Sequence, residues 1–342
     1  MSHCLKAVIP LAGKGTRLRP HTHLLPKPLM RVAGRPVLAH LLDELLRFGV
    51  TEMVFIVGHL DEVIRRYMAE AYPDLPVHYV VQAVQDGTAG AVKLAQPYVD
   101  GELLILFADT LFEADLSPAR TLSPEWSAVI WTREVEDYWK YGVVVTGADG
   151  AMTRIVEKPE QPVSRLANIG LYHVRDSALL FEGIDHVLAS PAGASGEYYL
   201  TDAFQYMVDR GARIRTAPVD SWHDCGSPEG LLSTNRHLLE AGGAAVSAAA
   251  RLNDCSLAHP VLVEADVVAE GSVLGPNVTL ERGARVVGSR LTNTIVGAGA
   301  RVEGARLDGS LVGAGAVVRG VEGRVNVSDH SVVEATGANE GA

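Results

Sequence analysis

The sequence predicts an α/β protein in which a doubly wound, mainly parallel sheet is followed by a parallel β-helix. Two observations support this fold class. Short β-branched runs alternate with amphipathic helical stretches up to about residue 240, and a six-residue apolar repeat replaces them beyond residue 260. A third observation concerns function: the segment 1–42 holds seven Lys and Arg and no Asp or Glu, in a chain with a net charge of −11.

The alternation of strand and helix patterns is clearest before Asp109. Strands are predicted at 6–12, 52–58, 77–82 and 102–109, and helices at 36–49, 60–71 and 88–99. Strands that alternate with helices of about 10 to 15 residues are typical of βαβ units, which build a parallel sheet. Ligands of such sheets bind beyond the carboxyl ends of the strands, where "LAGKGTR" and Asp109 are both predicted to lie.

The second half of the fold is predicted from a hexapeptide repeat. Apolar residues keep this spacing from position 262 onwards, at Leu262, Val268, Leu274, Leu280 and Val286. Turn-tolerant residues keep the same spacing between them, and "TIVGAGARV" at 294–302 recurs as "SLVGAGAVV" at 310–318. Hexapeptide periodicity is typical of a parallel β-helix, in which each coil stacks a flat apolar face on the next.

These patterns give the domain boundaries that the sequence predicts. The chain divides into a catalytic domain at 1–240, an Ala/Gly-rich linker at 241–256, a β-helix at 257–335 and a disordered tail at 336–342.

Composition limits the class of protein. No run of about 18 apolar residues is present, so no transmembrane helix is predicted, and the N-terminus lacks the apolar segment of a signal peptide. The three cysteines, Cys4, Cys225 and Cys255, are too few and too scattered for a disulfide framework or a C-x-x-C metal site. We therefore expect a cytoplasmic protein.

The acidic balance argues against nucleic acid as a partner, whereas a local cationic patch suits a small phosphorylated ligand.

The glycines of "GKGTRL" do not belong to either common nucleotide motif. A dinucleotide fingerprint requires a glycine where Leu18 stands, and a Walker A loop requires a lysine where Thr16 follows Gly15. What remains is a turn after a strand, in which Gly13 and Gly15 let the backbone approach a nucleotide and point amides at phosphate oxygens. Arg17 offers a planar fork for phosphates, and Lys27 is a point charge between two prolines.

The chain resembles the sugar-1-phosphate nucleotidyltransferases, also called NDP-sugar pyrophosphorylases. The resemblance covers roughly positions 5 to 240 and rests on motifs in the same order along the chain, "IPLAGKGTRLRPHT", "QAVQDGTAGAV", "LFADTLFEAD", "YGVV", "IVEKP", "ANIGLY", "GEYYLTDA" and "WHDCGSPEGLLSTN". It implies a Rossmann-like doubly wound, mainly parallel sheet of the nucleotide-diphospho-sugar transferase type. Long members of the family carry a left-handed parallel β-helix after it.

The reaction that the resemblance implies is attack of a sugar-1-phosphate oxygen on the α-phosphorus of an NTP, with pyrophosphate leaving. The nucleophile is already an anion, so the task is to bring two polyanions together and to stabilise charge in the transition state. By resemblance, Arg17, Lys27 and Lys158 are the catalytic cations. Lys27 would lie between the α-phosphate and the incoming sugar phosphate, which Lys158 would hold.

The resemblance also assigns the remaining site residues. Asp109 and Asp224 would hold Mg²⁺, although many members have Gly where this chain has Ala108. The nucleotide would be bound by Leu11, Ala12, Gly13, Lys14, Gly15, Thr16, Arg17, Gln82, Gly87 and Thr88, with the amide of Gln82 at a pyrimidine edge. The sugar phosphate would be bound by Gly142, Glu157, Lys158, Asn168, Tyr172 and Glu197. His21 and His23 are interpreted as loop residues and Cys225 as a packing residue.

The motifs leave the substrates open between two pyrimidine nucleotides. "LTDAF…WHDCGSPEGLL" and "YGVV" look most like glucose-1-phosphate thymidylyltransferases, whereas "IPLAGKGTR" looks nearer to the uridylyltransferases. We favour dTTP with glucose-1-phosphate narrowly, and keep a uridylyltransferase that makes UDP-glucose or UDP-N-acetylglucosamine as the alternative.

Two rivals come from other classes. A bifunctional enzyme would use His259 or His330 of the β-helix for acyl transfer, and a regulatory paralogue would have lost a catalytic cation or carboxylate. The flat sides of the β-helix predict a homo-oligomer.

Overall fold

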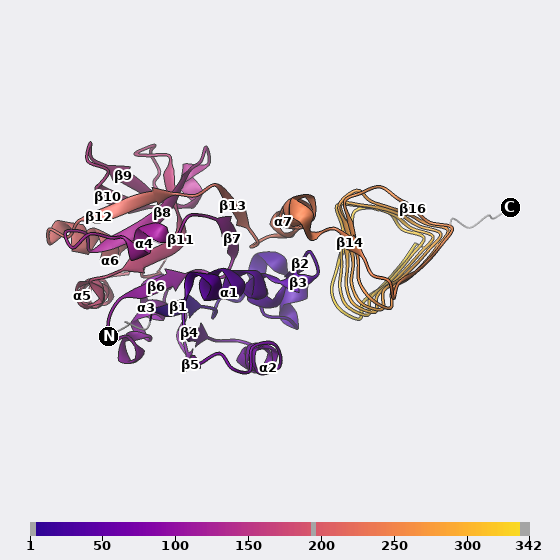
Figure 1. Ribbon diagram of the computed structural model, residues 1–342, viewed down its shortest axis with the longest axis horizontal. Coiled ribbons are helices and arrows are strands. Elements are labelled where there is room, and N and C mark those ends of the chain that lie inside the picture. The colour runs from indigo at the N-terminus through magenta and orange to yellow at the C-terminus, as the bar shows by residue number, and fades with distance from the viewer. Residues whose placement is uncertain (1–4, 193–195, 336–342) are drawn as a thin grey trace. The chain divides into compact units, whose positions relative to one another are not determined.

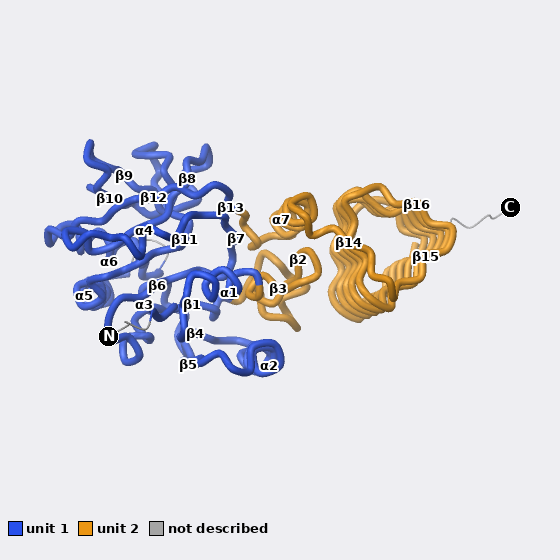
Figure 2. The backbone as a smooth tube through the Cα atoms, in the orientation of Figure 1, with its two compact units in different colours: residues 1–13, 40–222 blue, residues 14–39, 223–342 orange. Residues whose placement is uncertain are grey.

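The computed structural model describes residues 5–192 and 196–335, and these form two compact units (Figure 2). Unit 1 comprises residues 1–13 and 40–222, and unit 2 comprises residues 14–39 and 223–342. The cationic segment near the N-terminus therefore belongs to the same compact unit as the C-terminal coils. The sequence prediction instead places all of residues 1–240 in one catalytic domain.

Unit 1 is built on a mixed sheet of nine strands whose main path runs β10-β9-β11-β6-β1-β4-β5. Its centre is parallel, because β1 pairs in parallel with β4 and β6, and β4 with β5. β11 pairs antiparallel with β6, β8 and β9, and β12 joins β8 in parallel. This is the predicted Rossmann-like doubly wound sheet (Figure 1).

The strands of this sheet are β1 (Lys6–Pro10), β4 (Glu52–Val57), β5 (Val77–Val81), β6 (Leu103–Leu106), β8 (Ala128–Glu134), β9 (Gly142–Thr146), β10 (Met152–Glu157), β11 (Leu166–Val174) and β12 (Ile214–Pro218). The helices from α1 to α6 are α1 (Val37–Phe48), α2 (Asp61–Ala71), α3 (Thr88–Lys93), α4 (Ser117–Arg120), α5 (Ser177–Ala189) and α6 (Leu200–Asp209). Two short strands lie next to the predicted metal carboxylates. β7 (Thr110–Glu113) begins directly after Asp109, and β13 (Ser221–Asp224) ends at Asp224. Short 3₁₀ segments occur at Thr16–Leu18, His21–His23, Lys27–Leu29, Gln96–Tyr98 and Tyr138–Lys140.

The core of unit 1 explains why these segments adopt their structure. The central strands read as continuous apolar runs because helices cover both faces of a parallel sheet, and β6 is buried at every position. α5 and α6 pack together, and their apolar side chains, among them Leu180, Phe204 and Met207, share one cluster with Tyr172 and the strands. The sheet is therefore a rigid support for the loops at its carboxyl edge.

Unit 2 begins with the segment that carries the N-terminal cations. This segment contains the hairpin of β2 (Arg31–Val32) and β3 (Arg35–Pro36). α7 (Pro228–Leu238) packs against β2, and its N-cap Ser227 accepts a hydrogen bond from the amide of Gly230. A π-helical turn at Leu239–Gly243 leads from α7 into the coils.

The coils form three parallel sheets, the arrangement consistent with a left-handed β-helix (Figure 1). The first sheet holds β14 (Ala245–Val246), β17 (Val261–Val263), β20 (Val278–Leu280), β23 (Ile295–Val296), β26 (Leu311–Val312) and β29 (Asn326–Val327). The second holds β15 (Arg251–Asn253), β18 (Val268–Glu270), β21 (Arg285–Val287), β24 (Arg301–Glu303), β27 (Val317–Arg319) and β30 (Val332–Glu334). The third holds β16 (Ser256–Leu257), β19 (Val273–Leu274), β22 (Arg290–Thr292), β25 (Arg306–Asp308) and β28 (Glu322–Gly323).

The hexapeptide register predicted for these coils is wrong in part. The register of the second sheet shows that the coils shorten along the chain, so none of them keeps three full hexads. Leu274, Leu280 and Val286 are fully buried as predicted, whereas Leu262 and Val268 are only half-buried. The interior of the first coils is filled instead by their neighbours, which are Val261, Val263 and Val267.

The coils begin earlier than the predicted boundary of the β-helix. β14 and β15 lie within the stretch interpreted as a linker, and each pairs with the next strand of its sheet. The predicted disordered tail, 336–342, lies outside the described residues. No helix among residues 5–192 and 196–335 is long and apolar enough to cross a membrane.

Candidate active site

The cationic loop follows the carboxyl end of β1. Leu11 and Ala12 are buried and continue the strand into the core, so only their backbone can face a ligand. The next residues, Gly13, Lys14, Thr16 and Arg17, are exposed. A β-carbon on Gly13 would meet no atom within 4 Å, so the space beside this glycine is open.

Gly15 lets this loop close on itself. Its φ of 59° lies in the left-handed region, and a β-carbon there would lie 3.0 Å from both Lys27 Cβ and Thr22 Cγ2. The Thr22 hydroxyl donates to the Gly15 carbonyl at 2.8 Å, which holds the closed conformation. Gly15 is therefore required because the backbone passes close to the lysine that carries the predicted catalytic charge.

Three predicted residues meet over Gly226, although they come from distant parts of the sequence. A β-carbon on Gly226 would lie 2.6 Å from Arg17 Nη2, 2.7 Å from Asp224 Oδ1 and 3.1 Å from Lys27 Nζ. The Gly226 amide donates to Asp224 Oδ1 at 2.7 Å, and Arg17 Nη1 lies 3.6 Å from Asp224 Oδ2. Two cations and a carboxylate therefore converge on a residue with no side chain, and the positive charge gathered there suits a phosphate.

The two predicted metal carboxylates both lie at strand ends. Asp109 stands half-buried between β6 and β7, after the buried Ala108, and Asp224 ends β13. The described part of the chain contains no group of three or more His, Cys, Asp or Glu side chains that could hold a metal ion alone. A carboxylate is a donor that suits Mg²⁺, because this ion binds proteins through one or two carboxylates and completes its shell with waters and substrate phosphates.

Gln82 is the residue predicted at the nucleobase. Its side chain is buried, and its Nε2 donates to Asp86 Oδ1 at 3.1 Å and to the Gly87 carbonyl at 3.4 Å. Because both neighbours are acceptors, the amide orientation is fixed with Nε2 inward and Oε1 outward. Among the described residues Oε1 has no hydrogen-bond donor, so it can accept from a ligand.

The loop after Gln82 is bound to the segment that precedes α6. The Tyr198 amide donates to the Asp86 carbonyl at 2.8 Å, and the Ala89 amide donates to the Tyr198 carbonyl at 3.0 Å. Thr88 Oγ1 accepts from the Leu200 amide at 2.8 Å. Gly87 has a φ of 117°, and a β-carbon there would lie 2.6 Å from the Tyr198 amide nitrogen. The predicted nucleobase residues and the start of α6 therefore form one rigid assembly.

The predicted sugar residues come together on β9, β10 and β11. Asn168 Nδ2 donates to the Gly142 carbonyl at 2.8 Å, and a β-carbon on Gly142 would lie 2.8 Å from Glu157 Oε2. The Tyr172 hydroxyl donates to Asn168 Oδ1, but Tyr172 is only 2% exposed and its ring stacks on Phe204. Tyr172 thus supports Asn168 from the core, where burial raises the pKa of its hydroxyl far above the usual range.

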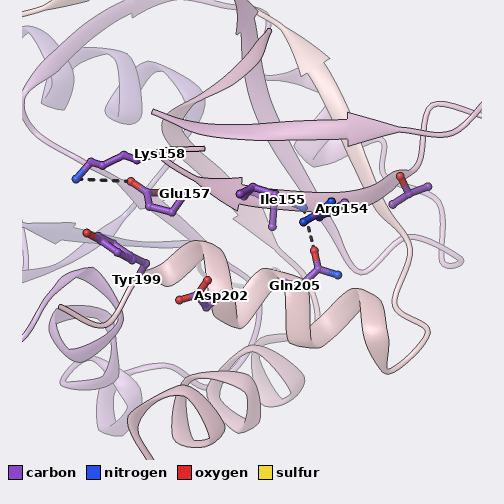
Figure 3. A pocket seen from close by; sticks show the side chains of 9 residues that line it. Arg154, Ile155, Glu157, Lys158, Tyr199, Asp202 and Gln205 are labelled. Carbon is purple, nitrogen blue, oxygen red and sulfur yellow. Dashed lines mark hydrogen bonds and ion pairs between the residues drawn. The ribbon is translucent and has the colours of Figure 1, made fainter. Parts of the chain in front are cut away.

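Glu157 and Lys158 line a pocket of about 640 Å³ between β10 and the start of α6 (Figure 3). Lys158 has a φ of 43°, a left-handed conformation that costs a non-glycine residue about 1–2 kcal/mol and occurs preferentially at functional sites. Its Nζ lies 4.0 Å from Glu157 Oε1 and 5.2 Å from the centre of the Tyr199 ring. Burial raises the pKa of the Glu157 carboxyl, while the nearby Lys158 charge opposes that shift.

The structure adds residues to this pocket that the sequence analysis does not identify. Thr201 Oγ1 donates to Glu157 Oε2 at 3.2 Å, and Tyr199 and Asp202 line the pocket. Burial also raises the pKa of Asp202. All three lie in the motif "GEYYLTDA", in which the sequence prediction names only Glu197, an exposed residue. The motif therefore marks this part of the pocket in the sequence, but residue type alone does not show which of its members line the pocket.

The remaining residues named in the sequence prediction lie outside these groups. Cys225 is buried, with its thiol 3.5 Å from the Thr234 hydroxyl, and His23 is exposed. His259 lies just before β17, and His330 lies between β29 and β30, so they stand at different corners of the coils. The two histidines do not form a common site.

Comparison with known proteins identifies the class to which this fold and site belong. The family model described as "Nucleotidyl transferase" matches residues 6–241, and the chain belongs to this family. It is thus an enzyme of nucleotidyl transfer, and the resemblance found in the sequence is confirmed.

The names of individual relatives describe their activities in more detail than the family model does. A UTP–glucose-1-phosphate uridylyltransferase, AglF of Haloferax volcanii, is 32% identical over 241 residues, which cover 69% of this chain and 97% of the relative. The bifunctional protein GlmU of Methanococcus maripaludis is 32% identical over 276 residues, which cover 80% of this chain but only 62% of the relative. A solved UDP-glucose pyrophosphorylase complexed with UDP-glucose has a TM-score of 0.62 at 23% identity, covers 69% of this chain and 98% of its own, and supports the fold alone.

Proposed function

We propose that this enzyme transfers the uridylyl group of UTP to glucose-1-phosphate, giving UDP-glucose and pyrophosphate. The observation that carries this choice is the similarity to the uridylyltransferase AglF, which extends over 97% of that relative's length. Fold and site agree with the proposal, since the cations over Gly226 suit a triphosphate and the pocket at Glu157 suits a sugar.

The proposed reaction needs cations more than it needs a base. An oxygen of the sugar phosphate attacks the α-phosphorus, its bond to phosphorus forms as the bond to pyrophosphate breaks, and no proton has to be removed. Arg17 and Lys27 would offset the charge of the triphosphate, and the backbone amides from Gly13 to Arg17 would bind its oxygens. Lys158 would hold the phosphate of the incoming sugar.

The carboxylates of Asp109 and Asp224 are proposed as ligands of Mg²⁺, which when bound supplies positive charge to the phosphate oxygens. The ion pair that Asp224 makes with Arg17 is long, at 3.6 Å between partly exposed side chains. Such a pair contributes about 0–1 kcal/mol, so Asp224 can exchange it for a metal at little cost.

The sugar would be oriented by acceptors rather than by charge. Glu157 is the buried acceptor of the pocket, and Thr201 already donates to one of its oxygens. Gly142 packs closely against this acceptor, since a β-carbon there would lie 2.8 Å from Glu157 Oε2 and against Asn168 Nδ2. Sugar hydroxyls in the pocket would donate to Glu157, which lines it.

The nucleobase is proposed to be a pyrimidine with a protonated ring nitrogen. The outward Oε1 of Gln82 is an acceptor, and uracil and thymine present an N3–H donor where cytosine presents an acceptor. This argument includes both UTP and dTTP. dTTP remains the second candidate because the motifs "YGVV" and "WHDCGSPEGLL" look most like thymidylyltransferases.

A matrix of substrates tests the proposal. Pyrophosphate release would be measured with UTP, dTTP, CTP, ATP and GTP, each against glucose-, N-acetylglucosamine-, galactose- and mannose-1-phosphate. We expect the highest kcat/KM for UTP with glucose-1-phosphate, and a lower value for dTTP. A higher kcat/KM for dTTP would assign the thymidylyl reaction, and release with purine nucleotides alone would contradict the pyrimidine assignment.

The β-helix is proposed to have a second role in assembly. Exposed large apolar side chains of the described coils are Val246 in the first coil and Val332 in the last, so its ends are better candidates for contact than its flat sides. Light scattering of the Val332→Glu variant would test this. A smaller mass than that of the wild-type protein is expected, and an unchanged oligomer would contradict a contact at that end.

A further inference from the structure

The cationic loop is attached to the β-helix at two places, one between Arg17 and Lys27 and one after Lys27. The first attachment lies between these two cations. His21 Nε2 donates to Asn326 Oδ1 at 2.7 Å, and the Ser328 hydroxyl donates to the Pro20 carbonyl at 3.3 Å. His21 is only 5% exposed, so its ring is fixed against the last coils although it belongs to a loop near the N-terminus.

The second attachment follows Lys27 and uses the first coils. Arg31 Nε donates to Glu281 Oε1 at 2.9 Å, and Arg31 Nη2 donates to Glu264 Oε1 at 3.0 Å. These two acids occupy the same corner of successive coils, and their other oxygens accept the amides of Ala298 and Arg282. Arg31 therefore joins a pair of carboxylates that the coils already hold in place.

Close packing accompanies this ion pair. Gly34 has a φ of 76°, and a β-carbon there would lie 2.6 Å from Glu264 Oε1 and 2.8 Å from Leu262 Cδ2. The side chain of Leu262 lies outside the buried cluster of the coils, and this contact with the hairpin covers part of it. The Ala33 amide donates to Asn235 Oδ1 at 2.9 Å, and Asn235 Oδ1 also accepts from the Thr279 hydroxyl of the coils.

Burial makes the attachments energetically costly to break. Glu281 is 5% exposed, and burial raises the pKa of its carboxyl while Arg31 opposes that shift. Removing one partner of a buried charge pair leaves the other uncompensated. The resting position of the loop is therefore determined by groups that lie far along the chain, in the C-terminal coils.

We propose that the β-helix positions the catalytic cations, with Asn326, Glu264 and Glu281 as positioning residues for Lys27 and Arg17. This inference rests on the proposed function only in assigning those cations to the phosphates. Its consequence is that residues outside the family's nucleotidyltransferase region contribute to turnover. A displacement of about 1 Å at reacting groups costs on the order of a hundredfold in rate, so loss of an attachment is expected to appear in catalysis.

The test uses the full-length protein with substitutions in the last coils. Asn326→Leu removes the acceptor of His21, Asn326→Asp keeps an acceptor oxygen at the same place, and Arg306→Gln changes an exposed side chain of the coils that has no ion pair among the described residues. Amide hydrogen exchange of residues 14–30 in the substrate-free protein would be measured first. Steady-state kinetics with UTP and melting temperatures would follow.

We expect Asn326→Leu to speed exchange in residues 14–30 and to lower kcat/KM for UTP by about tenfold, with exchange in 40–222 unchanged. Asn326→Asp should restore both values to within about twofold, and Arg306→Gln should match the wild-type protein. Unchanged exchange and kinetics in Asn326→Leu would overturn the inference, as would an equal loss in the Asp variant.

A second variant keeps the inference testable if Asn326→Leu melts early. Glu264→Gln combined with Glu281→Gln removes both carboxylates of the other attachment and should speed exchange of the same loop. Faster exchange across the coils without a change in residues 14–30 would contradict the proposal. Because exchange is measured without substrate, it remains informative if UTP and glucose-1-phosphate are not the substrates.

Discussion

The cationic loop of residues 14–39 and the sugar pocket at Glu157 are held in position in different ways. In the pocket, Gly142, Asn168 and Glu157 lie on paired strands, so hydrogen bonds between near neighbours fix them. In the loop, Arg17 and Lys27 stand on short 3₁₀ turns, and contacts of the loop with distant coils fix them. If the proposed function holds, the site for a neutral sugar is built within one sheet, whereas the cations for a triphosphate take their rigidity from distant coils.

The largest expected effect is the loss of the Lys27 charge. Lys27→Met should lower kcat/KM for UTP by about a thousandfold, because it removes a charge from the side of the reacting phosphate. Initial rates of pyrophosphate release measure this, with Lys93→Met as the control, since Lys93 pairs with Asp185 of α5, a helix that carries none of the family motifs. Activity within threefold of the wild-type protein would remove Lys27 from the mechanism.

The pocket should respond to a change of one methyl group. Gly142→Ala places a carbon 2.8 Å from Glu157 Oε2 and against the Asn168 amide, so KM for glucose-1-phosphate should rise about 10- to 100-fold. KM for UTP should change much less. Gly101→Ala is the matched control, because a β-carbon there meets nothing within 4 Å. Equal increases in both KM values would indicate a general disruption of the sheet.

The same change at Gly226, which lies against the charged groups of Arg17 and Lys27, should have a smaller effect. Gly226→Ala brings a methyl within 2.6 Å of Arg17 Nη2 and 3.1 Å of Lys27 Nζ, but both atoms end flexible side chains that can move aside. We expect about a tenfold loss of kcat/KM for UTP, against a larger loss for Gly142→Ala with the sugar phosphate. The opposite order would mean that the loop is the more rigid of the two regions.

The smallest predicted effect depends on pH. Burial raises the pKa of Glu157, so as the pH falls this carboxylate takes up its proton earlier than an exposed one and stops accepting from sugar hydroxyls. KM for glucose-1-phosphate should therefore rise a few-fold as the pH is lowered from neutrality. The phosphate group of the substrate itself titrates at about pH 6. The control is therefore Glu157→Gln, in which only the substrate's titration can change KM. Parallel pH profiles for the two enzymes would show that Glu157 does not titrate in this range.

Much of the fold is predictable because its signals are local. The apolar run of β6 and the helical stretch of α1 are decided by residues that are neighbours in the sequence. The β-helix is recognised from its repeat, but the interior position predicted for Leu262 is wrong, because coil lengths vary and its side chain packs on Gly34. The attachment of His21 to Asn326 spans 305 residues, and no pattern within either segment predicts it.

The site shows the same limit. The sequence indicates Arg17, Lys27 and Asp224, and the structure places all three around Gly226, whose importance depends only on what surrounds it. The resemblance implies that Tyr172 binds the sugar phosphate, but its burial behind Asn168 makes it a support. The type of a residue predicts the chemistry of its side chain. How exposed that side chain is, and which groups it faces, depend on the fold.

Transfer of the uridylyl group to the sugar phosphate is tested most directly with glucose-1-phosphate labelled with ¹⁸O in its phosphate group. The labelled sugar would be incubated with UTP and Mg²⁺, and the products followed by ³¹P NMR and mass spectrometry. Attack by the sugar phosphate on the α-phosphorus predicts that all of the label is in UDP-glucose and that unlabelled pyrophosphate forms in equal amount. Label in pyrophosphate, or consumption of UTP without a nucleotide sugar, would contradict the account.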